Sequence, residues 1–492
     1  MPRTWQGTKG RVLLKDKKEK GRYRYLAGNI ALFSVSNFVS KILVFLLVPL
    51  YTDVLTTYEY GIADIMQVTL LLLVPMLTFN MGEAALRFGI EHEDKRGSIL
   101  RCGLSYVVRA DAIVVGLCIM AFAFVAQETK WYVLLFAFLF IANNLYEFLV
   151  LYFQGCEAVP VVVIGSISST VVMIGANIFF LLFMKIGLNG YIFSQILAYA
   201  SASVIMLIIG KSAGLVKDLK DDAEMRSSML SYGTPLIAYS TGSWVNNAAD
   251  RYIVLALCGA AVNGVYGVAY KIPAILMVFQ RIFAQAWQMS ATKSYKDEKS
   301  EEFFTQMYRT YNCVMVTGCA VLIILVNPIA RFMFRKDFYE AWMFVPPLLM
   351  SVIFGALTGF LGSICLAYKD SKSMGIATSI GALANVAMNL ALIPKFGAMG
   401  AAVATAVSYA MMCAFAYRFV KKYVTIGNNI LVDILAYLIL VAISVAMIGQ
   451  VAGRYIICPI LAAVLFILYW RDIAEIFEKM TGLIKSRLHG RE

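Results

Sequence analysis

Long apolar runs, each close to the length of one membrane crossing, limit what this chain can fold into. A helix needs about 20 apolar residues to span a bilayer core, and runs of about that length follow one another along the 492 residues. Only 15% of the residues are charged, against about 25% in soluble domains. The pattern predicts an all-α polytopic membrane protein with about fourteen transmembrane helices. The predicted spans are 27–51, 60–86, 99–125, 131–154, 159–184, 187–209, 229–257, 263–289, 305–326, 339–366, 373–394, 398–418, 428–449 and 454–470.

Basic residues are spread unevenly over the predicted loops. Counted over alternate loops and the termini, 31 Lys and Arg residues fall on one side of the membrane and seven on the other. Positive charge collects on the cytoplasmic side of membrane proteins, so both termini are predicted to be cytoplasmic. This bias also accounts for the net charge of +13, and we therefore expect no nucleic-acid partner.

Cysteine and histidine usage argues against several kinds of chemistry. The nine Cys show no CxxC pairs, and most of them lie inside apolar runs, as small buried hydrophobic residues do. The two His, His92 and His489, lie in polar segments. We therefore expect no metal site, no catalytic residues and no cofactor, apart from H+ or Na+ as a coupling ion.

Two short motifs recur in the same order. EYGIAD (59–64) resembles VYGVAY (265–270), and MKIGLNG (184–190) resembles PKFGAMG (394–400), at offsets of 206 and 210 residues. Six predicted spans separate the copies, which indicates two parallel six-helix repeats. The predicted domains are a basic cytoplasmic arm (1–25), an N-lobe (26–210), a cytoplasmic connector (211–228), a C-lobe (229–420), two further helices (421–475) and a cytoplasmic tail (476–492).

The predicted hairpin 229–289 carries charges that a bilayer disfavours. A charged side chain in the hydrocarbon core costs about 3 kcal/mol or more, and it normally faces a cavity or a partner. Helical spacing aligns Ser240, Trp244, Asn247 and Arg251 on the first helix, with Asp250 beside them, and Tyr270, Met277, Arg281, Gln285 and Gln288 on the second. Lys271 follows Tyr270, and Pro273 is expected to kink this helix. These two helices are therefore predicted to line a polar path.

The first four spans carry further polar groups. Asn37 and Lys41 share one face of the first span, and Lys41 lies too near its middle to reach either surface easily. Asp64, Glu83 and Asp250 are candidates for ion coupling, although Glu83 and Arg87, four residues apart, also suit a local ion pair. For Arg109 in span 3 and Glu147 in span 4, an ion pair between the helices is the favoured interpretation.

Cations dominate the predicted central cavity. Lys41, Arg251, Lys271 and Arg281 would attract phosphate or carboxylate in a cleft of low dielectric constant. Trp244 and Tyr270 could offer stacking faces to sugar rings, although packing is the commoner use of such aromatic residues. The residues that we predict to bind substrate are Lys41, Arg251, Lys271, Arg281, Asn37, Asn247, Gln285, Trp244 and Tyr270.

Several segments resemble one transporter family. They are GNIALFSVSNFVSKILVFLLVPLYTDVLTTYEYGIADI near the start, NMGEAALRF (80–88), and SYGTPLI, NNAADRYI and GVYGVAYKIP in the charged hairpin. Over about 26–423 the chain resembles the Wzx-type flippases, the polysaccharide-transporter branch of the multidrug/oligosaccharidyl-lipid/polysaccharide exporter (MOP) superfamily. Lys41 and Lys271 stand where related lipid II flippases often have Arg. A lysine ammonium group is a point charge and lacks the two parallel N–H donors with which an arginine guanidinium contacts phosphate.

The resemblance implies a fold and an activity. Members are not enzymes; two six-helix lobes form a V, and alternating access carries undecaprenyl-diphosphate-linked oligosaccharide across the bacterial cytoplasmic membrane, in many members with an ion gradient. The implied partners are this lipid-linked substrate, membrane lipids, and the polymerase and glycosyltransferases of the same pathway. O-antigen, capsule and exopolysaccharide substrates stay open.

Other functions fit the residues less well. A lipid II flippase is the first alternative. A multidrug cation antiporter of the same superfamily would favour acidic residues in an otherwise uncharged cavity, which four cations contradict. A membrane glycosyltransferase or polymerase would need a large extramembrane loop or a DxD motif, and the chain offers neither.

Overall fold

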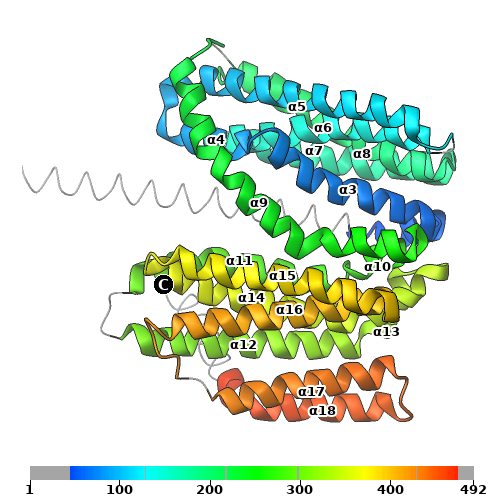
Figure 1. Ribbon diagram of the computed structural model, residues 1–492, viewed down its shortest axis with the longest axis vertical. Coiled ribbons are helices and arrows are strands. Elements are labelled where there is room, and N and C mark those ends of the chain that lie inside the picture. Colours follow the sequence, from blue (N-terminus) through cyan, green and yellow to red (C-terminus); the bar gives the residue numbers. More distant parts are fainter. Residues whose placement is uncertain (1–44, 128, 217–218, 296–298, 428, 475–492) are drawn as a thin grey trace, which may run out of the picture. The chain divides into compact units, whose positions relative to one another are not determined.

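The computed structural model describes residues 45–127, 129–216, 219–295, 299–427 and 429–474. Every regular element in these ranges is helical, which confirms the all-α prediction (Figure 1). Ten helices are long and apolar enough to cross a membrane, or eleven if a bent pair counts as one span, within these ranges. The chain is thus a multi-pass membrane protein.

The chain divides into two compact units, and two of the three divisions fall inside helices. Residues 69–240 belong to unit 1, and residues 48–68 and 241–474 belong to unit 2. Those two boundaries lie within α3 (Thr57–Leu77) and α9 (Ala223–Cys258), so each of these helices contributes to both units. The lobe boundaries predicted from the repeat, with a connector at 211–228, stay a prediction, as does the V-shaped arrangement.

The described part of unit 1 contains seven further helical elements. They are α4 (Met81–Glu91), η1 (Glu93–Lys95), α5 (Arg96–Phe124), α6 (Lys130–Gly155), α7 (Val159–Asn177) with its π-helical end η2 (Ile178–Phe183), and α8 (Gly187–Ser212). Buried residues of α4, α5, α6, α7, α8 and α9 form one core. Tyr152 is completely buried there, and its hydroxyl donates to Leu215 O at 2.6 Å. The segment after α8 is thereby held against this core.

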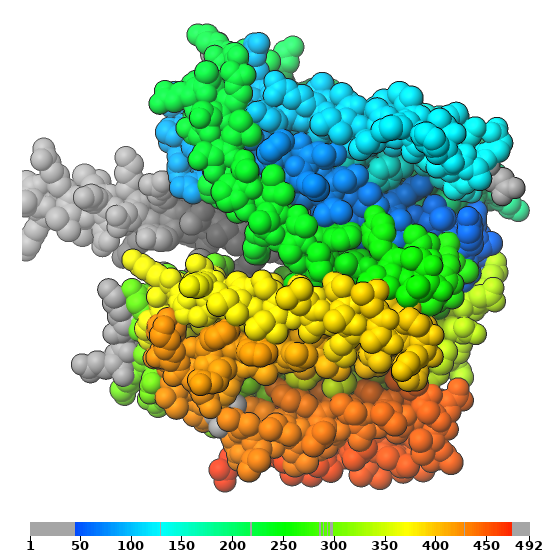
Figure 2. All heavy atoms as spheres, viewed as in Figure 1, coloured from blue at the N-terminus to red at the C-terminus, as the bar shows by residue number. Residues whose placement is uncertain are grey.

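Unit 2 is built around α14. Its other elements are α2 (Val48–Val54), α10 (Ala260–Ala269), α11 (Pro273–Ser294), α12 (Ser300–Ile324), α13 (Val326–Met333), η3 (Lys336–Phe344), α14 (Val345–Ala367), α15 (Ser371–Phe396), α16 (Ala398–Val420), α17 (Ile430–Ile448) and α18 (Arg454–Leu468). Helix α14 is apolar around its whole circumference and is buried by α11, α12 and α16, as expected of a central helix. The α17–α18 pair lies on one side, against α12 (Figures 1 and 2).

The predicted spans correspond closely to observed helices, with two breaks. Ten spans match the ten apolar helices, span 8 is the bent pair, span 14 is the short α18, and the first span lies almost wholly outside the described residues. Span 7 is α9, which is too polar to pass as a span on composition alone. The predicted span 60–86 is wrong as one helix, because Phe79 and Asn80 adopt left-handed backbone angles and separate α3 from α4.

The second repeated motif places a glycine with a positive φ at a helix junction in both copies. Gly187 and Gly397 are counterparts in MKIGLNG and PKFGAMG, and their φ angles are +53° and +57°. Each lies between two helices that pack together, α7–η2 with α8 and α15 with α16. Because glycine adopts a positive φ without a steric cost, both copies can close a helical hairpin at this position, although in the first copy Lys185 has a positive φ (+54°) as well.

Candidate functional site

The charged residues of α9 meet α3 inside unit 2. An ion pair joins Arg251 Nη1 to Asp64 Oδ1 at 2.9 Å, with side-chain exposures of 15% and 10%. The indole N–H of Trp244, two turns before Arg251 on α9, donates to Val68 O at 2.8 Å. Val68 lies one turn after Asp64 on α3. Part of the predicted polar stripe of α9 therefore packs against α3. We call the contact of α3, α9 and α10 around Asp64, Asp250 and Arg251 the seam.

Glycines allow the backbones at the seam to approach. A Cβ atom built on Gly61 would lie 1.9 Å from Ala260 O, and one on Gly264 would lie 1.9 Å from Thr57 O. Both distances are far below any real contact, so only glycine fits at either position. Gly61 belongs to the first copy of the repeated motif, and Gly264 directly precedes the second copy. The start of α3 and its repeat counterpart α10 thus pack directly on each other.

Asp250 is held by hydroxyl groups. Its Oδ2 accepts hydrogen bonds from Tyr266 (2.6 Å), Tyr270 (2.9 Å) and Thr405 (3.3 Å), and only 3% of the residue is exposed. The ring of Tyr270 also carries the Arg251 guanidinium 4.5 Å from its centroid. Asp250 Oδ1 also accepts from the backbone N–H of its neighbour Arg251 at 2.9 Å, whereas the Arg251 guanidinium contacts Asp64 and Tyr270.

The Asp250 cluster continues into a buried polar chain that the sequence analysis missed. Asn385 Nδ2 donates to Thr405 Oγ1 at 3.4 Å and to Ser408 Oγ at 3.1 Å, and Asn389 Nδ2 donates to Asn385 Oδ1 at 2.9 Å. Asn389 is fully buried, and its Oδ1 has no hydrogen-bond partner in the described part of the chain. The available signal was a pair of asparagines four residues apart inside an apolar run.

Lys271 and Arg281 are arranged differently from Arg251. Lys271 lies in the three-residue break between α10 and α11, where the helix axis bends by 49°. The predicted kink is confirmed, because α11 begins at Pro273, which lacks the N–H of a continuous helix. Arg281 is exposed on α11. Neither cation forms an ion pair within 4 Å among the described residues.

The remaining predicted site residues are placed as follows. Asn247 Oδ1 accepts from Tyr409 OH at 2.7 Å, and Glu83 is exposed in the first turn of α4 in unit 1. Asn37, Lys41 and the side chain of Gln285 lie outside the described residues. Among the predicted site residues that the structure describes, Asp64, Trp244, Asp250, Arg251 and Tyr270 make direct contacts at the seam.

Two expected ion pairs are wrong. Arg87 pairs with Glu91 at 3.2 Å rather than with Glu83, and its guanidinium lies over the Tyr232 ring. Arg109 lies over the ring of Tyr106, one turn earlier on α5, and does not reach Glu147. The contact that joins α5 to α6 at this level is a hydrogen bond from Asn144 Nδ2 to Asp111 Oδ1 at 2.8 Å. Sequence spacing could not select among several partners of equal charge.

A second polar cluster joins the C-terminal helices to the rest of unit 2. Asn312 of α12, fully buried, donates to Asp433 Oδ1 of α17 at 2.8 Å and accepts from Tyr437 OH at 2.9 Å. Tyr469 OH, just after α18, also donates to Asp433 Oδ1 at 3.1 Å. The α17–α18 pair is thus joined to α12 by buried hydrogen bonds as well as by apolar contact.

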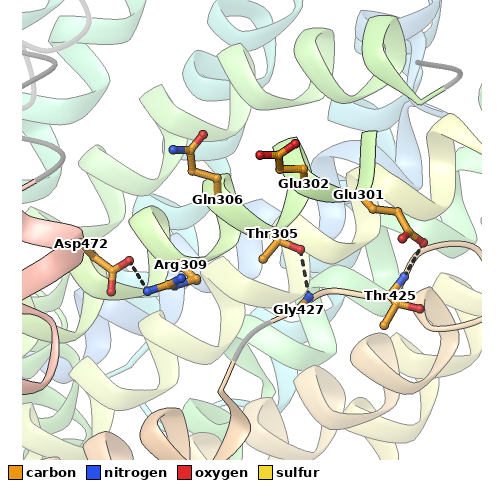
Figure 3. A pocket seen from close by; sticks show the side chains of 8 residues that line it. All are labelled: Glu301, Glu302, Thr305, Gln306, Arg309, Thr425, Gly427 and Asp472. Atoms are coloured by element: carbon orange, nitrogen blue, oxygen red, sulfur yellow. Dashed lines mark hydrogen bonds and ion pairs between the residues drawn. The ribbon is translucent and has the colours of Figure 1, made fainter. Parts of the chain in front are cut away.

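A pocket of about 390 Å³ lies one turn beyond this cluster. Figure 3 shows its lining, in which Arg309 and Asp472 pair at 3.0 Å and Thr305 and Glu301 hold the backbone of the α16–α17 loop at Gly427 and Thr425. In the described ranges, no three His, Cys, Asp or Glu side chains are grouped to hold a metal ion.

Known proteins match this chain over most of its length. A family model described as polysaccharide biosynthesis protein matches residues 26–290, and one described as lipid II flippase MurJ matches residues 288–466. A probable low-salt glycan biosynthesis flippase, Agl15 of Haloferax volcanii, is 23% identical over 204 residues, or 40% of this chain. The chain spans less than half the length of that relative, 43%.

Solved structures share the fold. A lipid II flippase MurJ in an inward closed conformation superposes with a TM-score of 0.66 at 17% identity, covering 92% of this chain and all of that one. An inward-facing multidrug resistance MATE family transporter of the MOP superfamily gives a TM-score of 0.64 at 10% identity, covering 78% and 94%. At these identities the likeness is one of fold. The first family model covers more than half of the chain, and the protein therefore belongs to the polysaccharide biosynthesis protein family.

Proposed function

We propose that this protein is a non-enzymatic flippase that moves undecaprenyl-diphosphate-linked oligosaccharide repeat units from the cytoplasmic to the outer leaflet by alternating access. The observation that carries the proposal is the pair Lys271 and Arg281. Both cations lie on the bent α10–α11 segment of a membrane protein, and neither is neutralised within 4 Å by a described carboxylate. A diphosphate would supply the missing anion, since low dielectric strengthens the attraction between opposite charges.

The bent segment suits this role. Broken helices line the substrate sites of many transporters, because a break exposes backbone and side chains to a cavity. Lys271 occupies the break itself, and Arg281 lies eight residues into α11, about 12 Å along the helix. Lys271 and Arg281 form the proposed diphosphate site, and Asn247 is proposed to contact the glycan. For Lys41, Asn37 and Gln285, whose side chains lie outside the described residues, substrate binding stays a prediction from the sequence.

The test is export by charge-neutralised variants. We expect Lys271→Gln combined with Arg281→Gln to reach the membrane in normal amounts and to lose surface polysaccharide export by at least about tenfold. Lys271→Arg with Arg281→Lys keeps both charges and serves as the matched control, which should retain export. Normal export by the Gln variant would contradict the cationic site.

A lipid II flippase is the second candidate, because the MurJ family model matches residues 288–466. The two functions differ in the intermediate that remains on the cytoplasmic side. In a deletion strain we expect an undecaprenyl-linked oligosaccharide to accumulate. Accumulation of lipid II, with arrested peptidoglycan synthesis, would favour the second candidate.

We also propose that Asp250 binds the coupling ion, H+ or Na+. Asp250, Thr405 and the unpartnered Oδ1 of Asn389 belong to one buried, oxygen-rich chain, and oxygen ligands are those that alkali cations prefer. Asp64 is a weaker candidate because Arg251 already neutralises it, and Glu83 is exposed in unit 1.

The proposed topology places both termini in the cytoplasm of a bacterial cell. A cysteine at Met184, exposed between η2 and α8, should react with a membrane-impermeant maleimide added outside. A cysteine at Lys372, exposed at the start of α15, should stay protected. The reverse labelling would invert the topology.

A further inference from the structure

One end of unit 2 carries a compact basic turn. Between α13 and η3, Arg331, Phe334, Arg335, Lys336 and Tyr339 line a pocket of about 340 Å³. Arg331, Arg335 and Lys336 are exposed, whereas Phe334 is only 2% exposed and anchors the turn in the core. No carboxylate contributes to the pocket lining. We call these five residues the basic turn.

The charge of the basic turn runs against the bias of the whole chain. The predicted topology assigns seven basic loop residues to the outer side, and four of them, Arg331, Arg335, Lys336 and Arg454, belong to this end of unit 2. Arg454 lies over the ring of Tyr455, whose hydroxyl accepts from Asn327 Nδ2 at 3.3 Å, just before Arg331 on α13. A local excess of cations where topology disfavours them indicates a function other than orientation.

The backbone of the basic turn is held in place before any ligand arrives. Thr52 of α2, fully buried, donates from Oγ1 to Met333 O at 2.9 Å and accepts from Arg335 N at 3.2 Å. Lys336 has a left-handed φ of +51° and contacts Asp53, with a distance of 3.8 Å between Nζ and Oδ1. Arg331 and Arg335 form no ion pair within the described ranges. Two guanidinium groups are thus presented on a rigid turn, an arrangement suited to phosphate oxygens.

We propose that the basic turn binds a phosphate group of a lipid at the outer face of the membrane, by Arg331 and Arg335 with support from Lys336. The phosphate comes either from an anionic phospholipid headgroup or from the carrier lipid after translocation. Arginine forms bidentate contacts with phosphate oxygens, and each basic residue near an anionic lipid surface contributes measurably to binding. The proposal adds an anion site distinct from Lys271 and Arg281, and its outer location rests on the proposed topology.

The test measures lipid binding by the purified full-length chain in neutral detergent, without any transport assay. The probes are dioleoyl phosphatidylglycerol and undecaprenyl phosphate, with dioleoyl phosphatidylcholine as the zwitterionic reference, followed by native mass spectrometry. We expect Arg331→Gln, Arg335→Gln and Lys336→Gln together to weaken binding of at least one anionic probe by about tenfold or more. Phosphatidylcholine binding should not change.

The matched control removes three of the other four basic residues of the same side, by Lys130→Gln, Lys185→Gln and Lys395→Gln, and leaves Arg454 in place. This control loses the same total charge as the basic-turn variant. Each variant also replaces one lysine with a left-handed backbone: Lys185 (φ +54°) in the control and Lys336 (φ +51°) in the basic-turn variant. Binding by the control should stay within about twofold of the parent. Preference for phosphatidylglycerol assigns the site to phospholipid, and preference for undecaprenyl phosphate assigns it to the carrier lipid.

Two results would overturn the proposal: equal loss of binding in both triple variants, or no loss in the basic-turn variant. Either result leaves the proposed flippase function intact, because that function is tested separately by export with Lys271 and Arg281 replaced. The basic-turn variant could lose phosphate binding and still export polysaccharide. This result would support the site as a lipid contact that export does not require.

Discussion

The seam and the α10–α11 break contain the same kinds of charged residue in opposite situations. At the seam, Arg251 has a carboxylate at 2.9 Å and an aromatic ring at 4.5 Å, and it is largely buried. At the break and beyond, Lys271 and Arg281 have no ion-pair partner within 4 Å among the described residues. Charge alone therefore does not identify a binding residue in a membrane protein. A cation whose partners are supplied by the fold stabilises the fold, and one without them can serve a ligand.

The strongest test of this contrast is the loss of Arg251. Arg251→Ala would leave Asp64 buried with an uncompensated charge, which typically destabilises a protein by about 3–5 kcal/mol. We expect a large fall in thermal unfolding temperature and in folded yield, measured on detergent-purified protein. Arg281→Ala is the matched control and should stay within about 0.5 kcal/mol of the parent. Equal losses in both variants would remove the distinction.

The second-largest loss of stability is expected where the backbones of α3 and α10 lie in close contact. Gly264→Ala would place a methyl group against Thr57 O and force two backbones apart, at a cost of about 1–3 kcal/mol by analogy with overpacked cores. Unfolding temperature is again the readout. Gly359→Ala in α14, where a Cβ would meet no atom within 4 Å, should be neutral or slightly stabilising.

Replacement of Asp250 tests whether this carboxylate couples an ion to transport or only stabilises the fold. In Asp250→Asn the three hydroxyl donors lose a charged acceptor, and we expect a loss of about 1–2 kcal/mol in stability. Transport by this variant should no longer depend on an imposed Na+ or pH gradient. Asp64→Asn should lower stability while leaving gradient dependence intact, and the opposite pattern would assign coupling to Asp64.

The smallest effect is expected at the start of α9, outside the spans. Hydrogen bonds from Met225 N (3.0 Å) and Lys95 (3.0 Å) lower the pKa of the Asp222 carboxyl. A lowered folded-state pKa stabilises the fold above the unfolded pKa, and the contribution is lost as pH falls through the folded pKa. Asp222→Asn should therefore increase amide exchange in the first turn of α9 at pH 7, and the difference should disappear in acid. Asp221→Asn is the control.

Much of the architecture could be predicted because the bilayer imposes strong local rules. Span length predicted the helices around Leu149 and Ile353, and Pro273 marked the break in span 8. The turn at Phe79 and Asn80, where both residues have left-handed backbone angles, was missed because neither residue is glycine or proline. Asn312 and Asp433 were missed because they are 121 residues apart and only folding brings them together.

By itself, the sequence determined that this chain spans a membrane many times, that two short motifs recur in the same order, and that cations collect on spans 7 and 8. Those properties follow from local composition and spacing, on which a helix in a bilayer depends directly. Only the tertiary structure decided which cation is neutralised, that Asp250 belongs to a hydroxyl and amide chain reaching Asn389, and that Arg331 and Arg335 share one rigid turn. Pairing depends on distances of a few ångströms between residues far apart in sequence, and helical periodicity carries no information about them.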